Sequence, residues 1–205
     1  MERIWLKSYP PGVPAEIDTQ QYRSLVELFE KSIRAYGDRP AFTSMGKTLR
    51  FSELDTLARN FGAWLQAKGL AKGARVALMM PNCLQYPIAM FGILRAGCTV
   101  VNVNPLYTPR ELEHQLKDAG AEAIVILENF AHVLQEVRPR TPIKHVVVTS
   151  LGEMLGVKGV IVNLVVRKLK KMVPPYDLPG AISFKEALNQ GNGKALNTPP
   201  LTHDD

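Results

Sequence analysis

Cysteine and histidine are scarce in this chain of 205 residues, which holds two cysteines and four histidines. Cys83 and Cys98 lie on either side of a predicted helix without the spacing of a metal site, so we expect each to be a small buried hydrophobe in a reducing compartment. The histidines are scattered and lack both ligand spacing and a nucleophile motif. The sequence therefore argues against a disulfide framework, a metal centre and histidine-based catalysis.

Long hydrophobic runs are also missing. The apolar runs are short of the roughly 20 residues that cross a bilayer, and the N-terminus lacks the charged start, apolar core and cleavage site of a signal peptide. With 46% hydrophobic and 21% charged residues, the composition is that of an ordinary globular protein. We expect a cytoplasmic protein with one sizeable core.

Glycine-rich and catalytic motifs are a third absence. No strand-to-helix turn carries G-x-G-x-x-G, and no G-x-S-x-G elbow occurs. The run from Gly191 to Lys194 looks like a phosphate loop, but Ala195 replaces the magnesium-binding hydroxyl and Leu188 the leading glycine, so we interpret it as a surface turn. The basic residues (net charge +6) are not interleaved with aromatics, and we expect no nucleic-acid partner.

Alternating strand and helix patterns are what the sequence does contain. A capping box at Ser24 opens a helix that ends at Gly37, and a hairpin follows. Ser52 with Asp55 then caps a second helix that runs to Lys68. Beyond it, β-rich runs alternate with helical periods: strands at 75–79, 99–103, 123–127 and 145–149, helices at 84–95, 109–119 and 130–137. This predicts an α/β fold, a Rossmann-like parallel sheet flanked by helices on both faces.

The stretch from Phe91 to Leu116, FGILRAGCTVVNVNPLYTPRELEHQL, is the most informative one. Gly97 stands where a helix ends in left-handed dihedrals, and the run from Thr108 to Glu111 spells an N-cap, a first-turn proline and a capping-box acid. Open parallel sheets bind ligands beyond the carboxyl ends of their strands. We therefore expect a cleft at Met80 to Asn82 and at Asn104 to Tyr107.

The same stretch resembles the early motifs of the adenylate-forming superfamily of acyl-CoA synthetases, most closely those of the bacterial long-chain fatty-acid:CoA ligases. Thr48 to Leu54 resembles the family's first motif, and Val76 to Asn82 resembles the strand and turn after it. Ile4 to Leu6 and Tyr9-Pro10 resemble the opening of these ligases. The resemblance covers nearly all of the chain and implies the N-terminal part of the family's large AMP-binding domain.

For the complete protein, the resemblance implies activation of a long-chain fatty acid with ATP and Mg²⁺, then transfer of the acyl group to coenzyme A. The family's phosphate-binding loop and catalytic lysine lie beyond Asp205, so we assign no catalytic, cofactor-binding or metal-binding residue here. We expect this chain alone to be inactive and to bind no cofactor. Related ligases form dimers through N-terminal segments, which implies a homodimer.

Two other functions fit the same residues. The residues of the acyl pocket are not in view, so a ligase for another carboxylate, an aryl or medium-chain acid, stays open. A non-catalytic Rossmann-like binding module stays open too, because a fold does not fix a function.

The chain divides into four parts in this interpretation. They are an extended N-terminal arm (1–20), an α/β subdomain (21–150), a basic amphipathic segment (151–175), and a short helix with a tail that leads to the ATP-binding part (176–205).

The basic amphipathic segment supplies the contact residues that we single out: Lys158, Arg167, Lys168, Lys170 and Lys171. Its periodicity predicts a helix over 157–173 with an apolar face of Val162, Val165, Val166, Leu169, Met172 and Val173. That face either lies on the inner face of the cell membrane, with the basic side chains at anionic headgroups, or packs on protein. The sequence leaves both interpretations open.

Overall fold

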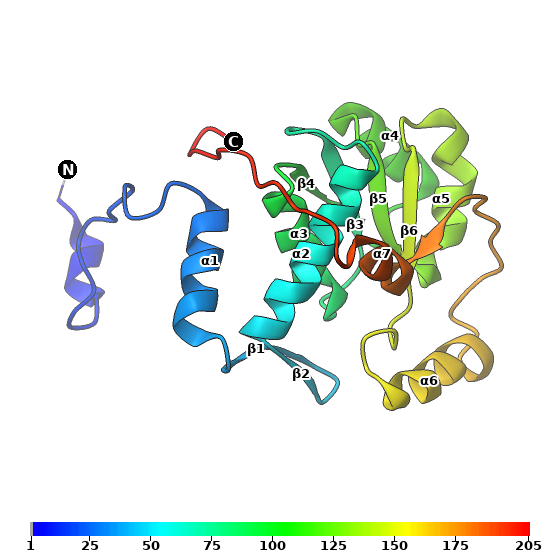
Figure 1. Ribbon diagram of the computed structural model, residues 1–205, viewed down its shortest axis with the longest axis horizontal. Coiled ribbons are helices and arrows are strands. Elements are labelled where there is room, and N and C mark those ends of the chain that lie inside the picture. Colours follow the sequence, from blue (N-terminus) through cyan, green and yellow to red (C-terminus); the bar gives the residue numbers. More distant parts are fainter. Residues whose placement is uncertain (1) are drawn as a thin grey trace.

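The computed structural model describes residues 2–205, and Figure 1 shows an α/β body from which the N-terminal segment extends. A short 3₁₀ turn, two helices and a hairpin precede the sheet: η1 Ile4–Ser8, α1 Leu25–Tyr36, β1 Pro40–Ser44, β2 Lys47–Arg50 and α2 Phe51–Ala67. The Phe29 ring of α1 stacks on Phe91, with 3.8 Å between the ring centroids. This contact ties α1 to the body.

A parallel sheet of five strands lies at the centre, in the order β4-β3-β5-β6-β7. The strands are β3 Arg75–Met79, β4 Thr99–Asn102, β5 Ala123–Leu127, β6 His145–Thr149 and β7 Ile182–Ser183. In the register, Val76 of β3 pairs with Val100 of β4 and with Ala123 of β5. The predicted parallel sheet is confirmed, whereas β7 is a strand that the sequence patterns do not predict.

Helices cover both faces of the sheet (Figure 1). Besides α2 they are α3 Gln85–Arg95, α4 Pro109–Ala119, α5 Ala131–Val137 and α7 Phe184–Gly191. Alternate residues of a strand point to opposite faces. Val76 and Leu78 of β3 therefore pack with α2, α3 and α7, whereas Ala77 and Met79 pack with α4 and α5. Each β3 face is buried, which explains why the strand is a continuous apolar run.

Helices α2 and α3 approach each other at a pair of glycines. A Cβ atom on Gly62 would lie 2.7 Å from the carbonyl oxygen of Gly92, and a Cβ on Gly92 would lie 2.8 Å from that of Ala58. Both distances are shorter than a real Cβ contact. The two backbones can pack this closely only because neither position carries a side chain.

The helix boundaries confirm most of the predicted caps. Gly97 has φ +79° after α3, and Thr108 accepts a hydrogen bond from the Glu111 amide in a capping box at the start of α4. The predicted cap at Ser52 was wrong, because α2 begins at Phe51 and Ser52 therefore lies inside the helix. There Glu53 accepts a hydrogen bond from the Arg50 amide at 2.9 Å, which moves the cap to Arg50.

The two cysteines are buried, as expected. Burial raises the pKa of the Cys98 thiol to about 11, so this thiol stays protonated at neutral pH. None of the helices within residues 2–205 has the length and apolar character needed to span a membrane.

The basic segment departs from the predicted continuous helix. Helix α6 runs over Val157–Leu164, and a π-helical turn, η4, follows at Val165–Leu169. In Figure 1, α6 lies at one end of the sheet, apart from the helices that cover its faces. A π turn widens the backbone by one residue and rotates the side chains that follow it. The single apolar face predicted over 157–173 is therefore not kept.

Candidate functional site

The carboxyl ends of the parallel strands meet at one edge of the sheet, where open α/β sheets bind ligands. Glu128 follows β5 directly, and Ser150 follows β6. A cavity of about 450 Å³ lies at this edge, between the strand ends, α6 and the connection to β7. Its polar lining includes Glu128, Thr149, Ser150, Glu153, Asn163, Arg167, Tyr176 and Ser183.

An ion pair spans the cavity. The Glu128 side chain is only 4% exposed, and that of Arg167, on the π turn, is 49% exposed. Arg167 donates from Nε to both carboxylate oxygens at 3.0 Å and from Nη2 to Oε2 at 2.7 Å. These hydrogen bonds raise the pKa of the Arg167 guanidinium above its ordinary value. The geometry is bidentate, which gives the pair a fixed orientation.

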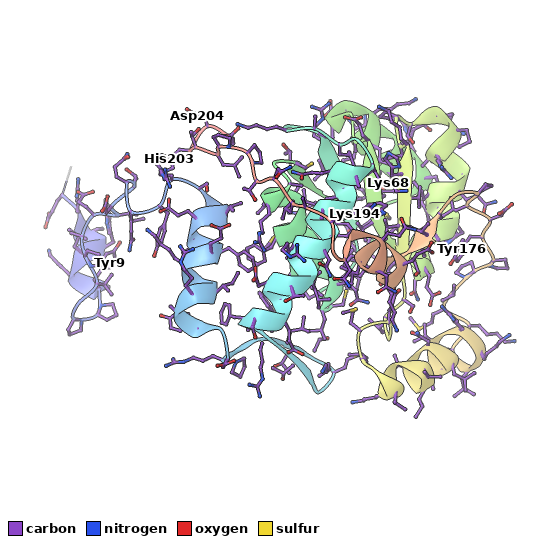
Figure 2. The ribbon with its side chains drawn as sticks, in the orientation of Figure 1. Tyr9, Lys68, Tyr176, Lys194, His203 and Asp204 are labelled. Carbon is purple, nitrogen blue, oxygen red and sulfur yellow. The ribbon has the colours of Figure 1, made fainter. Side chains whose placement is uncertain are left out.

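Tyr176 borders the same cavity from the connection between α6 and β7 (Figure 2). Burial raises the pKa of its phenol, and the nearby Glu128 carboxylate raises it further. The phenol is therefore neutral at physiological pH, and it can serve as a hydrogen-bonding group rather than as a base.

A second polar cluster holds the loop after β6. Gln85 donates to Thr149 Oγ1 at 3.0 Å and to the Ser150 carbonyl at 2.8 Å. Thr149 donates to Glu153 Oε2 at 2.6 Å, and the Lys185 amide donates to Glu153 Oε1 at 2.9 Å. The Glu153 carboxylate thus joins the end of β6 to the start of α7, and each of its oxygens is already in use.

Helix α6 faces this edge with small and polar residues. Asn163 accepts from the Gly152 amide at 2.8 Å and donates to Ser150 Oγ at 2.9 Å. A Cβ on Gly159 would lie 1.8 Å from the Gly152 carbonyl oxygen, so only glycine fits there. Gly159 and Asn163 are spaced by four residues, which places them on one side of α6, and the ion pair with Glu128 turns Arg167 of the π turn toward the same edge.

The polar groups at this edge bind mainly one another. Both carboxylates have protein donors, and within residues 2–205 there is no group of three or more His, Cys, Asp and Glu side chains that could hold a metal ion. Nor does a nucleophile lie beside a free base in this network. We conclude that these contacts fix the segment around α6 onto the strand ends.

Of the two segments predicted to line a cleft, 80–82 borders a cavity and 104–107 forms a turn. Asn82 lines a cavity of about 380 Å³ between α3 and the β1–β2 hairpin. Asn104 instead serves the turn into α4, where its Oδ1 accepts from the Leu106 amide at 3.0 Å. Sequence reasoning missed the Glu128–Arg167 pair, although the spacing of Gly159, Asn163 and Arg167 was a readable signal for an inward polar stripe.

The five basic residues of the segment take three different positions. Lys158 donates to the Met45 carbonyl at the hairpin tip, at 2.7 Å. Arg167 points inward to Glu128. Lys168, Lys170 and Lys171 are exposed, and their side chains make no hydrogen bond or ion pair with any described residue. The structure therefore brings three of the five together at the C-terminal end of the segment.

Comparison with known proteins finds clear relatives. The family model described as AMP-binding enzyme matches residues 29–172. The chain is 54% identical to a long-chain-fatty-acid–CoA ligase of Escherichia coli O6:H1 and 55% identical to one of Yersinia pestis, over 100% of this chain and 37% of each relative. The chain thus spans about 37% of the length of these curated relatives.

A solved structure shares the fold. An anthranilate CoA ligase in complex with anthranoyl-AMP matches with a TM-score of 0.70 at 19% identity, covering 90% of this chain and 31% of that one.

Proposed function

The chain belongs to the AMP-binding enzyme family, and on that premise we propose that it is part of a long-chain fatty-acid:CoA ligase. The observation that carries the proposal is the 54% identity, over the whole chain, to a ligase of that name. In the proposed reaction, a fatty-acid carboxylate oxygen attacks the α-phosphorus of ATP and pyrophosphate leaves. The coenzyme A thiol then attacks the acyl carbon, loses its proton, and displaces AMP.

ATP, Mg²⁺ and coenzyme A are the proposed substrates and metal of the complete protein. The described residues do not fit the nucleotide or the metal. The turn from Gly191 to Lys194 is the end of α7, where a Cβ on Gly191 would lie 1.9 Å from the Asn60 carbonyl oxygen, so this backbone faces α2 rather than a ligand. We therefore propose that the phosphate-binding and metal-binding groups belong to parts of the protein outside residues 2–205.

The role proposed for this chain is that of a scaffold. The parallel sheet and its two helical layers give a rigid core, and the hydrogen bonds of Glu128 and Glu153 hold the loops at its carboxyl edge. No residue of the chain is proposed as catalytic. The chain alone is expected to show no ATP–pyrophosphate exchange, because the chemistry needs the missing groups.

Location and assembly are further parts of the proposal. We place the ligase in the cytoplasm, with the basic segment in peripheral contact with the inner face of the cell membrane, and as a homodimer to which the N-terminal arm contributes. The exposed Lys168, Lys170 and Lys171 support the membrane contact. The exposed apolar side chains of the arm, Trp5 and Ile17 among them, support the dimer contact.

The test is acyl-CoA formation by the full-length protein over a series of acids from butanoate to oleate, with benzoate and anthranilate alongside. We expect the highest kcat/KM for the long-chain acids. A maximum at an aryl or medium-chain acid would replace the long-chain assignment by the ligase for another carboxylate. Failure with every acid, together with failure to exchange pyrophosphate into ATP, would favour the non-catalytic binding module.

A further inference from the structure

Helix α6 turns most of its apolar side chains outward, and only Val162 of them packs against the core. The side that meets the sheet edge carries Gly159, Asn163 and Arg167, which are held by backbone contact, hydrogen bonds and the Glu128 ion pair. The opposite side carries Val157, Val160, Ile161 and Leu164, which are 85%, 70%, 63% and 60% exposed. These four lie at helical spacings of three and four, so they form one continuous apolar stripe, which we call the α6 outer stripe.

The polar contacts fix which side faces outward. Rotating α6 to bury the outer stripe would remove the Asn163 hydrogen bonds and leave the Glu128 carboxylate, 4% exposed, without its cationic partner. An unpaired buried charge is strongly unfavourable. The outward position of the stripe is therefore built into the segment.

The charges that adjoin the stripe are all positive. Lys168 lies on the π turn that follows Leu164, and Lys170 and Lys171 come directly after that turn; all three side chains are exposed. From Val157 to Leu169 the chain has no acidic residue. The nearby acids, Glu128 and Glu153, have their oxygens bound by protein donors. An apolar stripe that ends in unneutralised lysines complements a surface that is apolar below and anionic above.

We propose that the α6 outer stripe, together with Lys168, Lys170 and Lys171, docks onto an anionic lipid membrane. The valine, isoleucine and leucine side chains enter the acyl boundary, and the three lysines meet the phosphate groups of the lipids. Lys158 is excluded from the set of lipid-binding lysines, because it already donates to the Met45 carbonyl. Arg167 is excluded from lipid contact by its ion pair.

This proposal deepens the proposed membrane contact and rests on it for the choice of partner. It does not depend on the ligase reaction. A lipid surface is favoured over a second copy of the chain because the charges that flank the stripe are all positive, and the same surface of a second copy would carry no acids to neutralise them. Packing against another copy or another part of the protein is kept as an outcome of the test.

The test is co-sedimentation of the full-length protein with vesicles of phosphatidylcholine, alone or mixed with phosphatidylglycerol. We expect binding to the mixed vesicles only, weakened by salt, and reduced about tenfold or more in the Lys168→Glu/Lys170→Glu/Lys171→Glu variant. A matched variant, Arg34→Glu/Arg110→Glu/Lys194→Glu, changes the charge equally on α1, α4 and the tail, and should bind within about twofold of wild type by the same principle.

A second pair of variants isolates the apolar contribution. Val160→Ser/Ile161→Ser should also reduce binding about tenfold, because both side chains leave the acyl boundary. Ile17→Ser/Leu106→Ser, which changes exposed apolar residues elsewhere, should not. Circular dichroism checks that each variant is folded. Acyl-CoA synthesis from a fatty acid supplied on albumin, measured in parallel, should be unchanged in all four.

Three results would overturn the docking proposal. The first is no binding of the wild type to anionic vesicles, and the second is binding by both α6 variants as strong as that of the wild type. The third is a wild-type dimer that Val160→Ser/Ile161→Ser dissociates in the absence of lipid, which would assign the stripe to a second copy. A wild-type protein that binds lipid but shows no ligase activity would overturn the proposed function and leave the docking proposal unaffected.

Discussion

Helices α4 and α6 are both amphipathic, but they face the protein in opposite ways. Helix α4 buries Leu112 and Leu116 against the sheet and turns its charged residues to solvent. Helix α6 turns Asn163 inward and leaves Leu164 in solvent. An amphipathic pattern therefore identifies two different sides of a helix, while the partners offered by the rest of the chain decide which side is inside.

The largest expected difference between the two helices follows from truncating a leucine on each. Leu116→Ala removes a fully buried side chain and should lower the free energy of unfolding by about 2–5 kcal/mol, because a cavity is left in the core. Leu164→Ala removes an exposed one and should change stability by less than about 0.5 kcal/mol. Urea midpoints of the full-length protein, with hydrogen exchange of the two helices as the local measurement, provide the comparison. If Leu164→Ala destabilised the protein as much as Leu116→Ala, α6 would be packed on protein after all.

A smaller effect should come from the polar anchor of α6. Arg167→Met leaves the buried Glu128 carboxylate without its cation and should lower the free energy of unfolding by about 1–3 kcal/mol. This loss is smaller than for a wholly buried pair because Arg167 is half exposed. Hydrogen exchange should increase in α6 and stay unchanged in α4. The double variant Glu128→Gln/Arg167→Met is the control, since it removes the buried charge as well and should recover part of the loss. A single variant as stable as wild type would contradict an anchoring role.

The sequence was sufficient for α4 because all of its signals are local. Thr108, Pro109 and Glu111 mark its start, Gly120 with φ +60° ends it, and the leucines mark its buried side. Strands β3, β5 and β6 were equally readable, since residues buried on both faces give short apolar runs, whereas the two-residue β7 gave no such run. A family resemblance then supplied what no local pattern could, which is the enzyme family to which this α/β fold belongs.

The sequence was insufficient for α6 because its anchors are distant. Arg167 pairs with a carboxylate 39 residues earlier in the chain, and no periodicity reveals such a partner. The predicted apolar face is also split in the structure, with Val162 and Val166 half-buried and Leu169 and Met172 exposed. The π turn at Val165–Leu169 causes this split, because it breaks the helical repeat on which the prediction relied.

The smallest expected difference concerns pH. On the solvent side of α4, Glu113 accepts from Lys117 at 2.6 Å and from Arg140 at 2.8 Å, which lowers the pKa of its carboxyl below the ordinary 4.5. A lowered folded-state pKa means that the pairs stabilise the fold above pH 4.5 and lose this effect as the pH falls through the lower value. Helix α6 has no acid on its outer side, so its charges do not change over this range.

The comparison is between Glu113→Gln and Lys168→Gln, each measured against wild type in urea from pH 7 to pH 3. The Glu113→Gln protein should be slightly less stable than wild type at pH 7, and this difference in stability should narrow as the pH falls through the lowered pKa of the wild-type carboxyl. The difference in stability between Lys168→Gln and wild type should stay constant, because Lys168 has no acidic partner that could lose its charge over this range. If the difference in free energy of unfolding between Glu113→Gln and wild type were as large at pH 3 as at pH 7, this residue would act through packing. The electrostatic contrast between the two helices would then fail.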